Sequence, residues 1–453
     1  MTDVSLQSER MIAARLERLP VSSWHIKVST VLGVAVFFDA FDSIALAFVL
    51  PVLVGAWGIA PQQIGGLIAI GNAGQALGAL GCGIIAERFG RVKTAQWTIL
   101  LFAAMSLACA FAQNFDQLFW LRFIQGIGLG GEVPVAAAYV TEITRADRRG
   151  SAYLFYQMIF PVGFLLAAIA GAFIVPRFGW QWMFIIGVVP AAIAAVLRRY
   201  CQESPRWLAS RGRLDEAEKT LGEIEAIVSR NGARPLAAPV LLAVAGDAKR
   251  TRWQELFEGR YRKRTLIAWA LWSSAYLVSY GLQTWLPTLY RTVYNVPLQQ
   301  ALNYTLIANI CSLVGTLLCA ALIDRLGRRA WFIGAFFLTG LPLIVLWGMG
   351  TQTVLAVIIA TSTCYTWVAS ICLAVYLYTA EIYPTRMRAL GTSWATFWLR
   401  IAATIGPLLV GFFLPSLGIG GLFFIFGAIA WLGFVAAFFT IEPRGRILEE
   451  VSP

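Results

Sequence analysis

The sequence predicts an all-α membrane protein with twelve transmembrane helices, arranged as two pseudo-symmetric six-helix bundles. Three observations predict this fold class. Of 453 residues, 58% are hydrophobic and 13% charged, and the mean hydropathy is +0.70, which is too apolar for a soluble chain. Apolar runs of about 20 residues, enough for a helix to cross about 30 Å of hydrocarbon, recur along the chain. Motifs of its first half also return in its second half.

The apolar runs fall into two sets of six, separated by a polar stretch. The first set occupies 29–54, 64–86, 95–113, 117–141, 151–174 and 180–197. The second set occupies 265–289, 300–322, 330–348, 353–378, 389–413 and 419–440. The predicted organisation is an N-terminal segment (1–28), a first bundle (29–197), a central loop with short helices (198–264), a second bundle (265–440) and a tail (441–453).

Lysine and arginine are distributed unevenly around these helices. With a cytoplasmic N-terminus, 32 of the 36 lie on the cytoplasmic side, Arg177 and Arg291 lie outside, and Arg122 and Arg400 lie within helices. The positive-inside rule therefore predicts that both termini are cytoplasmic. The formal charge of +12 follows from this topology, so we expect a lipid bilayer and no nucleic acid as partner.

The first 28 residues lack the apolar core and cleavage site of a secretory signal. Between Ser8 and Leu19, apolar side chains share one side of a helical pattern and charges occupy the other. This pattern predicts an amphipathic cytoplasmic helix that lies on the membrane surface before Pro20.

The two halves repeat each other in sequence. The run Glu87-Arg88-Phe89-Gly90-Arg91 returns as Asp324-Arg325-Leu326-Gly327-Arg328, 237 residues later. Nearly the same offset relates Glu142-Ile143 to Glu381-Ile382. Parallel repeats of this kind are typical of transporters, whose site lies between the repeats near the bilayer midplane.

These motifs resemble those of the major facilitator superfamily, and the resemblance covers the whole chain. The run from Arg122 to Pro134, with Glu203-Ser204-Pro205-Arg206, is similar to the sugar-porter-related branch. Within it, Asp39-Ala40-Phe41-Asp42 and Tyr280-Gly281 look most like bacterial niacin and aromatic-acid/proton symporters. The chain departs from sugar porters in having only Gln283 where they have paired glutamines, and Glu87 stands where Asp is usual.

Five ionisable residues are predicted at bilayer depth, where an ionised side chain needs a partner or water: Asp39, Asp42, Arg122, Glu132 and Arg400. Asp42 and Arg122 lie on adjacent helices that run in opposite directions. Pairing stabilises the ionised carboxylate, whereas burial without a partner favours the neutral acid. The resemblance implies that this pair carries the proton; the alternative is a permanent ion pair that joins two helices.

Asp39, nearly one turn before Asp42, can share either role. Glu132 lies among glycines that allow close helix packing, and both a proton relay and an interhelical hydrogen bond suit it.

Arg400 is the only basic residue deep in the second half. A guanidinium offers paired hydrogen bonds to a carboxylate, so we expect it to bind an organic anion, with an internal acid such as Glu132 as the alternative partner. The resemblance to organic-anion carriers with an arginine in the matching helix supports this role. The other candidate substrate contacts are Tyr280, Gln283, Trp367 and Gln157.

The repeated loop motifs predict a cytoplasmic gate, in which Glu87 and Asp324 lie at the N-termini of neighbouring helices and the motif arginines bind C-terminal carbonyls and acids. We expect Glu142 to pair with Arg148 or Arg149, and Glu381 to pair with Arg386 or Arg388. The predicted gate residues are Glu87, Arg88, Gly90, Arg91, Asp324, Arg325, Gly327, Arg328, Glu142, Arg149, Glu381 and Arg388.

Together these features predict a monomeric symporter of the bacterial inner membrane that imports a small organic anion with protons. Nicotinate or another aromatic carboxylate is favoured over a sugar acid, sugar or polyol, and a proton-coupled metabolite or drug exporter is the nearest alternative. A transporter-like receptor is less favoured because the predicted tail is short. No nucleophile-base set and no metal-ligand spacing is visible in the sequence, so we expect neither an enzyme nor a bound metal or cofactor.

Overall fold

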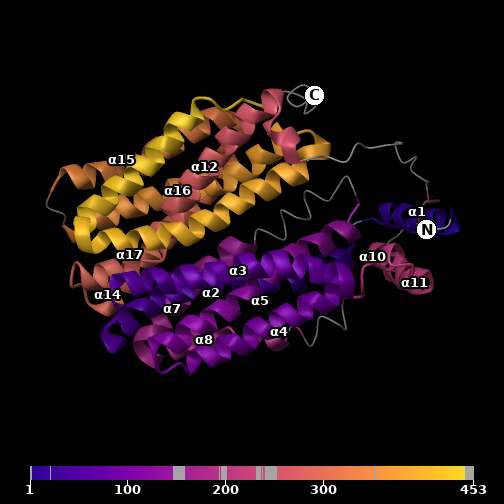
Figure 1. Cartoon of the computed structure of the whole chain (residues 1–453), viewed down its shortest axis with the longest axis horizontal. Coiled ribbons are helices and arrows are strands. Elements are labelled where there is room, and N and C mark those ends of the chain that lie inside the picture. The colour runs from indigo at the N-terminus through magenta and orange to yellow at the C-terminus, as the bar shows by residue number, and fades with distance from the viewer. Residues whose placement is uncertain are drawn as a thin grey trace. The chain divides into compact units, whose positions relative to one another are not determined.

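A computed structural model describes residues 3–20, 22–145, 159–192, 201–230, 253–350 and 353–443, together with 194, 236, 238 and 239. Every regular element in this part of the chain is helical (Figure 1). The N-terminal elements are α1 (Asp3–Glu17), α2 (Ser23–Trp57), α3 (Pro61–Phe89), α4 (Arg91–Ala110), α5 (Phe115–Ile143), α7 (Ile159–Phe178) and α8 (Gln181–Ile186).

The remaining elements begin in the central loop. They are α10 (Pro205–Ser210), α11 (Leu214–Arg230), a 3₁₀ turn η1 (Trp253–Phe257), α12 (Gly259–Gln283), α13 (Leu286–Thr292), α14 (Leu298–Leu326), α15 (Arg328–Gly348), α16 (Val354–Ile382) and α17 (Thr385–Ala437). Eight helices in the described residues are long and apolar enough to cross a membrane, and two shorter apolar helices cover Val162–Phe178 and Gln181–Ala192. Eleven of the twelve predicted spans overlap one of these ten helices, and the remaining span, 265–289, overlaps α12 and α13.

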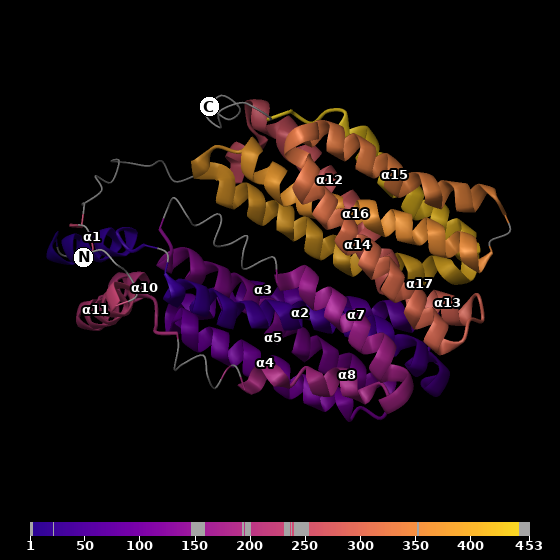
Figure 2. The same cartoon turned by 180° about the vertical axis from the view of Figure 1, so that it is seen from behind.

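The chain's contacts divide it into two units. The first contains Met1–Asp42, Ala73–Leu166 and Gln181–Ala248; the second contains Ser43–Asn72, Ala167–Trp180 and Lys249–Pro453. In the first unit α4 and α5 lie side by side in both views (Figures 1 and 2). In the second unit α12 packs along α17, and α14 packs along α16.

Glycines bring α3 and α5 close together in the first unit. A Cβ on Gly74 or Gly78 would overlap the backbone carbonyls of Phe123 or Ile127 on α5, and a Cβ on Gly130 would overlap Gln75 on α3. Small residues at helix contacts allow such close approach in a bilayer. This packing holds α5 firmly beside α3.

One predicted helix is divided in the structure, and two others meet without a loop between them. The single helix expected over 265–289 is divided into α12 and α13, because Pro287 lies in the first turn of α13 and has no N–H to continue the earlier helix. The two helices expected over 389–413 and 419–440 are both present within α17, where the non-helical Gly418 (φ 63°) separates them.

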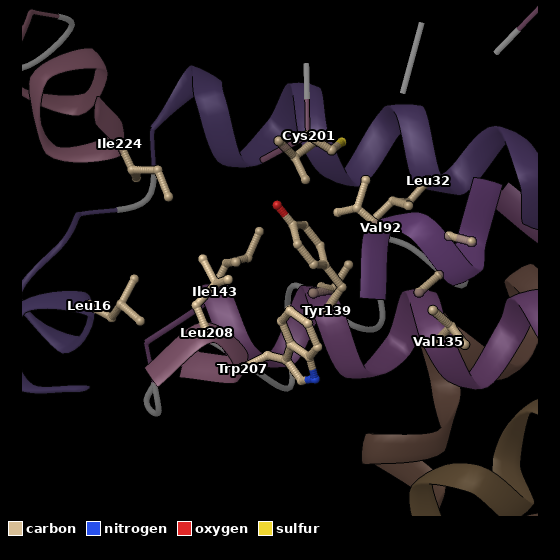
Figure 3. Close-up of a cluster of buried hydrophobic side chains, with 14 of the residues drawn as sticks. Leu16, Leu32, Val92, Val135, Tyr139, Ile143, Cys201, Trp207, Leu208 and Ile224 are labelled. Carbon is tan, nitrogen blue, oxygen red and sulfur yellow. The ribbon is translucent and has the colours of Figure 1, made fainter. Parts of the chain in front are cut away.

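The amphipathic N-terminal helix packs on protein. Ile12, Leu16 and Leu19 of the α1 segment are buried in one cluster with Trp207 of α10 and Ile224 of α11 (Figure 3). These three side chains are therefore covered by protein, whereas the sequence pattern placed them against the membrane surface. The apolar face of α1 packs instead against α10 and α11, two short helices of the central loop.

Ion pairs fix α1 on α11. Arg15 binds Glu225 at 2.8 Å and Glu218 at 2.9 Å, and Arg18 binds Glu225 at 2.7 Å. Burial opposes the ionisation of Glu225, but the hydrogen bonds from the two arginines outweigh it and lower the pKa of this carboxyl. The N-terminal helix is therefore held by both apolar contact and charge.

Candidate functional site

A buried polar cluster of three side chains joins α2 to α5. Arg122 Nη1 donates to both carboxylate oxygens of Asp42, at 2.8 and 2.7 Å, and to Gln125 Oε1 at 2.8 Å. Gln125 Nε2 donates to Asp42 Oδ1 at 2.9 Å. Asp42, Arg122 and Gln125 are 3%, 5% and 0% exposed. We call these three residues the Asp42 triad.

Helix geometry explains how the triad forms. Arg122 and Gln125 are three residues apart, so they share one face of α5, and that face meets Asp42 near the middle of α2. A buried ion pair is tolerated only when further hydrogen bonds satisfy its charges, and Gln125 supplies two of them. Among the residues that the structure describes, Arg122 Nε has no hydrogen-bond partner, so one guanidinium donor remains unused.

The other two residues predicted to take part in proton coupling are also buried, at different positions. Asp39 is 6% exposed, one turn before Asp42 on α2, and Glu132 is 3% exposed on α5. Ten residues separate Glu132 from Arg122, a distance of about 15 Å along the helix. The structure thus brings Asp42 and Arg122 together, while Glu132 is remote from them.

The candidate substrate residues of the second unit lie in varied surroundings. Arg400 on α17 is half-buried. Gln283 Nε2 donates to Asn309 Oδ1 of α14 at 3.4 Å, a polar contact near the end of α12. Trp367 packs against Trp331 of α15, with ring centroids 6.1 Å apart, so part of its surface is occupied by protein. Tyr280 packs beside Tyr276, with ring centroids 6.1 Å apart, and Gln157 lies outside the described residues.

One buried hydroxyl of α16 stands out. Tyr365 is 3% exposed, and within the described part of the chain its hydroxyl has no hydrogen-bond partner. A buried polar group without a partner costs stability.

Two capping carboxylates hold the loop motifs in place. Glu203 accepts from the backbone N–H groups of Arg91 and Val92, at 2.8 and 3.2 Å, at the start of α4. Glu442 accepts from the N–H groups of Arg328 and Arg329, at 3.1 and 2.8 Å, at the start of α15. Carboxylates at helix N-termini are stabilising, and the duplicated arrangement repeats in each unit.

The glycine of each motif makes room for its carboxylate. Gly90 and Gly327 have φ of 110° and 90°, a backbone region that favours glycine. A Cβ on Gly90 would overlap the Glu203 carboxylate, and one on Gly327 would lie 2.6 Å from Glu442 Oε2. Both the backbone conformation and the close approach therefore require glycine.

The arginines that follow these glycines bind acids on the next long helix of each unit. Arg91 binds Glu142 at 3.0 Å and Arg328 binds Glu381 at 2.7 Å. The side chains predicted to pair with these acids, Arg149 and Arg388, lie outside the described residues, as do those of the alternatives Arg148 and Arg386.

The acids and first arginines of the motifs are exposed. Glu87 and Asp324 form ion pairs with Arg91 and Arg328, at 3.5 and 2.7 Å, within their own motifs. The acids at the helix N-termini are therefore Glu203 and Glu442, whereas the sequence assigned that position to Glu87 and Asp324. The side chains of Arg88 and Arg325 lie at the surface.

A proline in α17 explains another polar contact that the sequence did not indicate. Pro407 has no N–H, so it cannot donate to the carbonyl of Ala403 one turn earlier. Asn72 Nδ2 of α3 donates to that carbonyl at 2.6 Å instead, and both residues belong to the second unit. The Pro407 carbonyl in turn accepts from Trp285 Nε1 at 3.1 Å.

We expect Asn72→Ala to destabilise the protein by about 1–3 kcal/mol, because it leaves the Ala403 carbonyl without a donor. Adding Pro407→Ala restores an N–H at the helical position and should recover most of the loss. Thermal unfolding in detergent of the two single variants and the double variant measures this coupling. A double variant no more stable than Asn72→Ala would contradict the role of Asn72.

Comparison with known proteins places the chain in a family. The family described as sugar (and other) transporter matches residues 36–453. The niacin transporter NiaP of Acinetobacter baylyi is 32% identical over 445 residues, covering 97% of this chain and 99% of that protein. The 4-hydroxybenzoate transporter PcaK of Pseudomonas putida is 31% identical and covers 86% of each chain.

Solved structures agree on the fold. The crystal structure of a D-xylose-proton symporter has a TM-score of 0.71 at 18% identity, and covers 92% of this chain and 97% of that chain. A partially occluded inward-open structure of the xylose transporter XylE from E. coli also has a TM-score of 0.71, at 20% identity, and covers 94% of this chain and 100% of that chain. The chain thus has the major facilitator fold, as the sequence predicted.

The family match extends over nearly the whole chain, and the embedded polar residues lie within it. The chain therefore belongs to the sugar (and other) transporter family of the major facilitator superfamily, and it is a multi-pass membrane transporter of small metabolites rather than an enzyme.

Proposed function

We propose that this protein is a proton-driven symporter that imports a small organic acid, an aromatic carboxylate or nicotinate, across the bacterial inner membrane. The observation that carries the proton coupling is the buried Asp42 triad, in which a carboxylate at bilayer depth is held by one arginine and one amide. Such a carboxylate has two states, ionised and bound to Arg122 or protonated and released from it.

The substrate class is supported by Arg400 and by the relatives. A half-buried guanidinium in the second unit offers paired hydrogen bonds to a carboxylate. Three relatives are named as transporters of niacin, 4-hydroxybenzoate and gallate, and all three solutes are aromatic acids. The names of the relatives and the chemistry of Arg400 therefore favour the same kind of molecule.

The proposed cycle begins with the site open to the outside. The substrate carboxylate binds Arg400 and a proton binds Asp42, which releases Arg122 and permits the transporter to open to the other side. Return requires that Asp42 lose the proton to the cytoplasm and bind Arg122 again. The charge distribution supports a cytoplasmic N-terminus for this cycle.

The test is uptake into proteoliposomes of nicotinate, nicotinamide, 4-hydroxybenzoate, gallate, xylose and gluconate, with and without an acid-outside pH gradient. We expect one or more aromatic acids to accumulate only under the gradient. Equal uptake of a neutral sugar would overturn the assignment to organic acids, and gradient-driven movement in the opposite direction would identify an exporter.

For the acid that accumulates, we expect Arg400→Gln to raise the KM by about 10- to 100-fold, because the substrate carboxylate loses a charge-assisted hydrogen bond. Arg400→Lys should recover part of the affinity, because lysine keeps the positive charge but lacks the planar guanidinium that makes paired hydrogen bonds. Arg291→Gln, near the end of α13, is the matched control. An unchanged KM in Arg400→Gln would remove Arg400 from the substrate site.

A further inference from the structure

Gln125 is positioned between the two charged members of the triad. Its Nε2 donates to Asp42 Oδ1 at 2.9 Å, and its Oε1 accepts from Arg122 Nη1 at 2.8 Å. The side chain is fully buried. A glutamine amide has one donor end and one acceptor end, and here each end meets the only kind of partner that suits it.

The orientation of this amide is determined by its neighbours. Arg122 can only donate, and an ionised Asp42 can only accept. The reverse orientation would face the amide N–H₂ toward the guanidinium and the amide oxygen toward the carboxylate, so both contacts would be repulsive. While Asp42 is ionised, Gln125 is therefore held in one state.

A proton on Asp42 disturbs this arrangement at either oxygen. Oδ2 faces Arg122 Nη1 at 2.7 Å, and Oδ1 faces both Arg122 Nη1 at 2.8 Å and the Gln125 amide. A proton on Oδ2 opposes only the Arg122 donor, and Oδ1 can still accept from Gln125 and Arg122. A proton on Oδ1 opposes both donors, and if Gln125 turns by 180° to accept from the new O–H, its N–H₂ opposes Arg122 and the Arg122–Gln125 hydrogen bond is lost as well.

We propose that Gln125 is the positioning residue that holds Asp42 in its ionised, Arg122-bound state until Asp42 takes up a proton. While Asp42 is ionised, both ends of the Gln125 amide are bound, and the carboxylate has a second donor besides Arg122. Without Gln125 the ionised carboxylate loses this donor, so Asp42 takes up a proton, and the pair separates, more readily. The inference rests on the proposed proton symport and adds a residue to its mechanism.

Among the residues that the structure describes, the helices of this cluster present few other ionisable groups. From α4, Cys109 Sγ lies 3.6 Å from Gln125 Oε1. On α2 itself, Asp39 lies one turn away, and Arg122 is the charged group that α5 presents. Within the described residues of α7, the only charged side chain is Arg177, which packs on Phe173. A pH effect at Asp42 therefore involves Arg122 directly, with Asp39 as the nearest second acid.

The first experiment reads the protonation of Asp42 without any substrate. Dicyclohexylcarbodiimide modifies protonated carboxyl groups in membranes, and peptide fragmentation by mass spectrometry distinguishes Asp42 from Asp39. In Gln125→Leu the carboxylate loses a donor, so it takes up a proton more readily. We expect the pH of half-maximal labelling at Asp42 to rise by about one unit.

The matched control is Gln96→Leu, which makes the same substitution on α4, where Gln96 Nε2 donates to the Ala194 carbonyl at 2.9 Å. We expect its labelling profile to match that of the wild-type protein. An unchanged midpoint in Gln125→Leu, or an equal shift in Gln96→Leu, would overturn the inference, whether or not the transport proposal is correct.

The second experiment separates coupling from translocation in proteoliposomes, with labelled nicotinate and 4-hydroxybenzoate as probes. We expect Gln125→Leu to reduce gradient-driven accumulation by about tenfold, while exchange of internal for external substrate stays within about twofold of wild type. Gln125→Glu, whose protonated form offers the same donor and acceptor ends, should recover accumulation at acid pH and not at alkaline pH.

The outcomes distinguish the two proposals. Wild-type protein that accumulates neither acid under the gradient overturns the proposed function for these solutes, and the labelling experiment still decides the role of Gln125. Wild-type accumulation together with wild-type coupling in Gln125→Leu overturns the inference alone.

Discussion

Asp42→Asn is expected to abolish accumulation against a concentration gradient while leaving substrate exchange active. The asparagine amide keeps the size and polarity of the protonated acid but has no proton to release. With one proton per substrate, a gradient of two pH units can drive up to about 100-fold accumulation, and this factor should fall to about one. Proteoliposome uptake at a fixed gradient, compared with exchange at equal pH, measures it.

The matched control for this variant is Asp116→Asn, which removes an exposed carboxylate from the first turn of α5. It should retain both accumulation and exchange. Accumulation by Asp42→Asn at the wild-type level would show that the proton travels by another group, and Asp39 and Glu132 would be the next residues to test.

Arg122→Leu is expected to produce the largest loss of stability. It leaves the Asp42 carboxylate, 3% exposed, with a single hydrogen bond and no counter-charge, and it removes the donor to Gln125. Removing one partner of a buried ion pair costs about 3–5 kcal/mol, because the remaining charge is unsatisfied. Unfolding in detergent micelles, followed by heating or by denaturant, should show this loss.

The double variant Asp42→Asn/Arg122→Leu identifies the cause. Removing the unpaired charge of Asp42 should recover more than half of the lost unfolding free energy. Arg177→Leu, at an exposed position, is the control for loss of an arginine. A double variant as unstable as Arg122→Leu would mean that the arginine stabilises the fold through apolar packing rather than through its charge.

Sequence reasoning identified two of the three members of the triad. Asp42 and Arg122 were recognisable because a charge at bilayer depth demands a partner, and the pair is formed in the structure. Gln125 gave no such signal, since a neutral amide in a helix is compatible with many environments. Its role depends on which face of α5 meets α2, and that is decided by packing.

The second helix-capping carboxylate, Glu442, is predictable from the sequence repeat. Glu203 begins the motif Glu203-Ser204-Pro205-Arg206, and Glu442-Pro443-Arg444 repeats much of it at an offset of 238 or 239 residues, close to that of the other repeats. Applying the duplication to these residues would have found the second cap. The N-terminal helix was misplaced for a related reason, because an amphipathic pattern shows that one face is buried but does not show against what.

The sequence by itself determined the class of the protein and the positions of its helices, because the thickness of the bilayer sets the length of each apolar run and the duplicated motifs indicate the family. Which acid binds which arginine, that an asparagine replaces the donor missing at Pro407, and that an amide lies between Asp42 and Arg122 were decided only by the tertiary structure. Hydropathy is a property of single segments, whereas a hydrogen bond between helices depends on the rotation and depth of both, and these follow from close packing along their whole length.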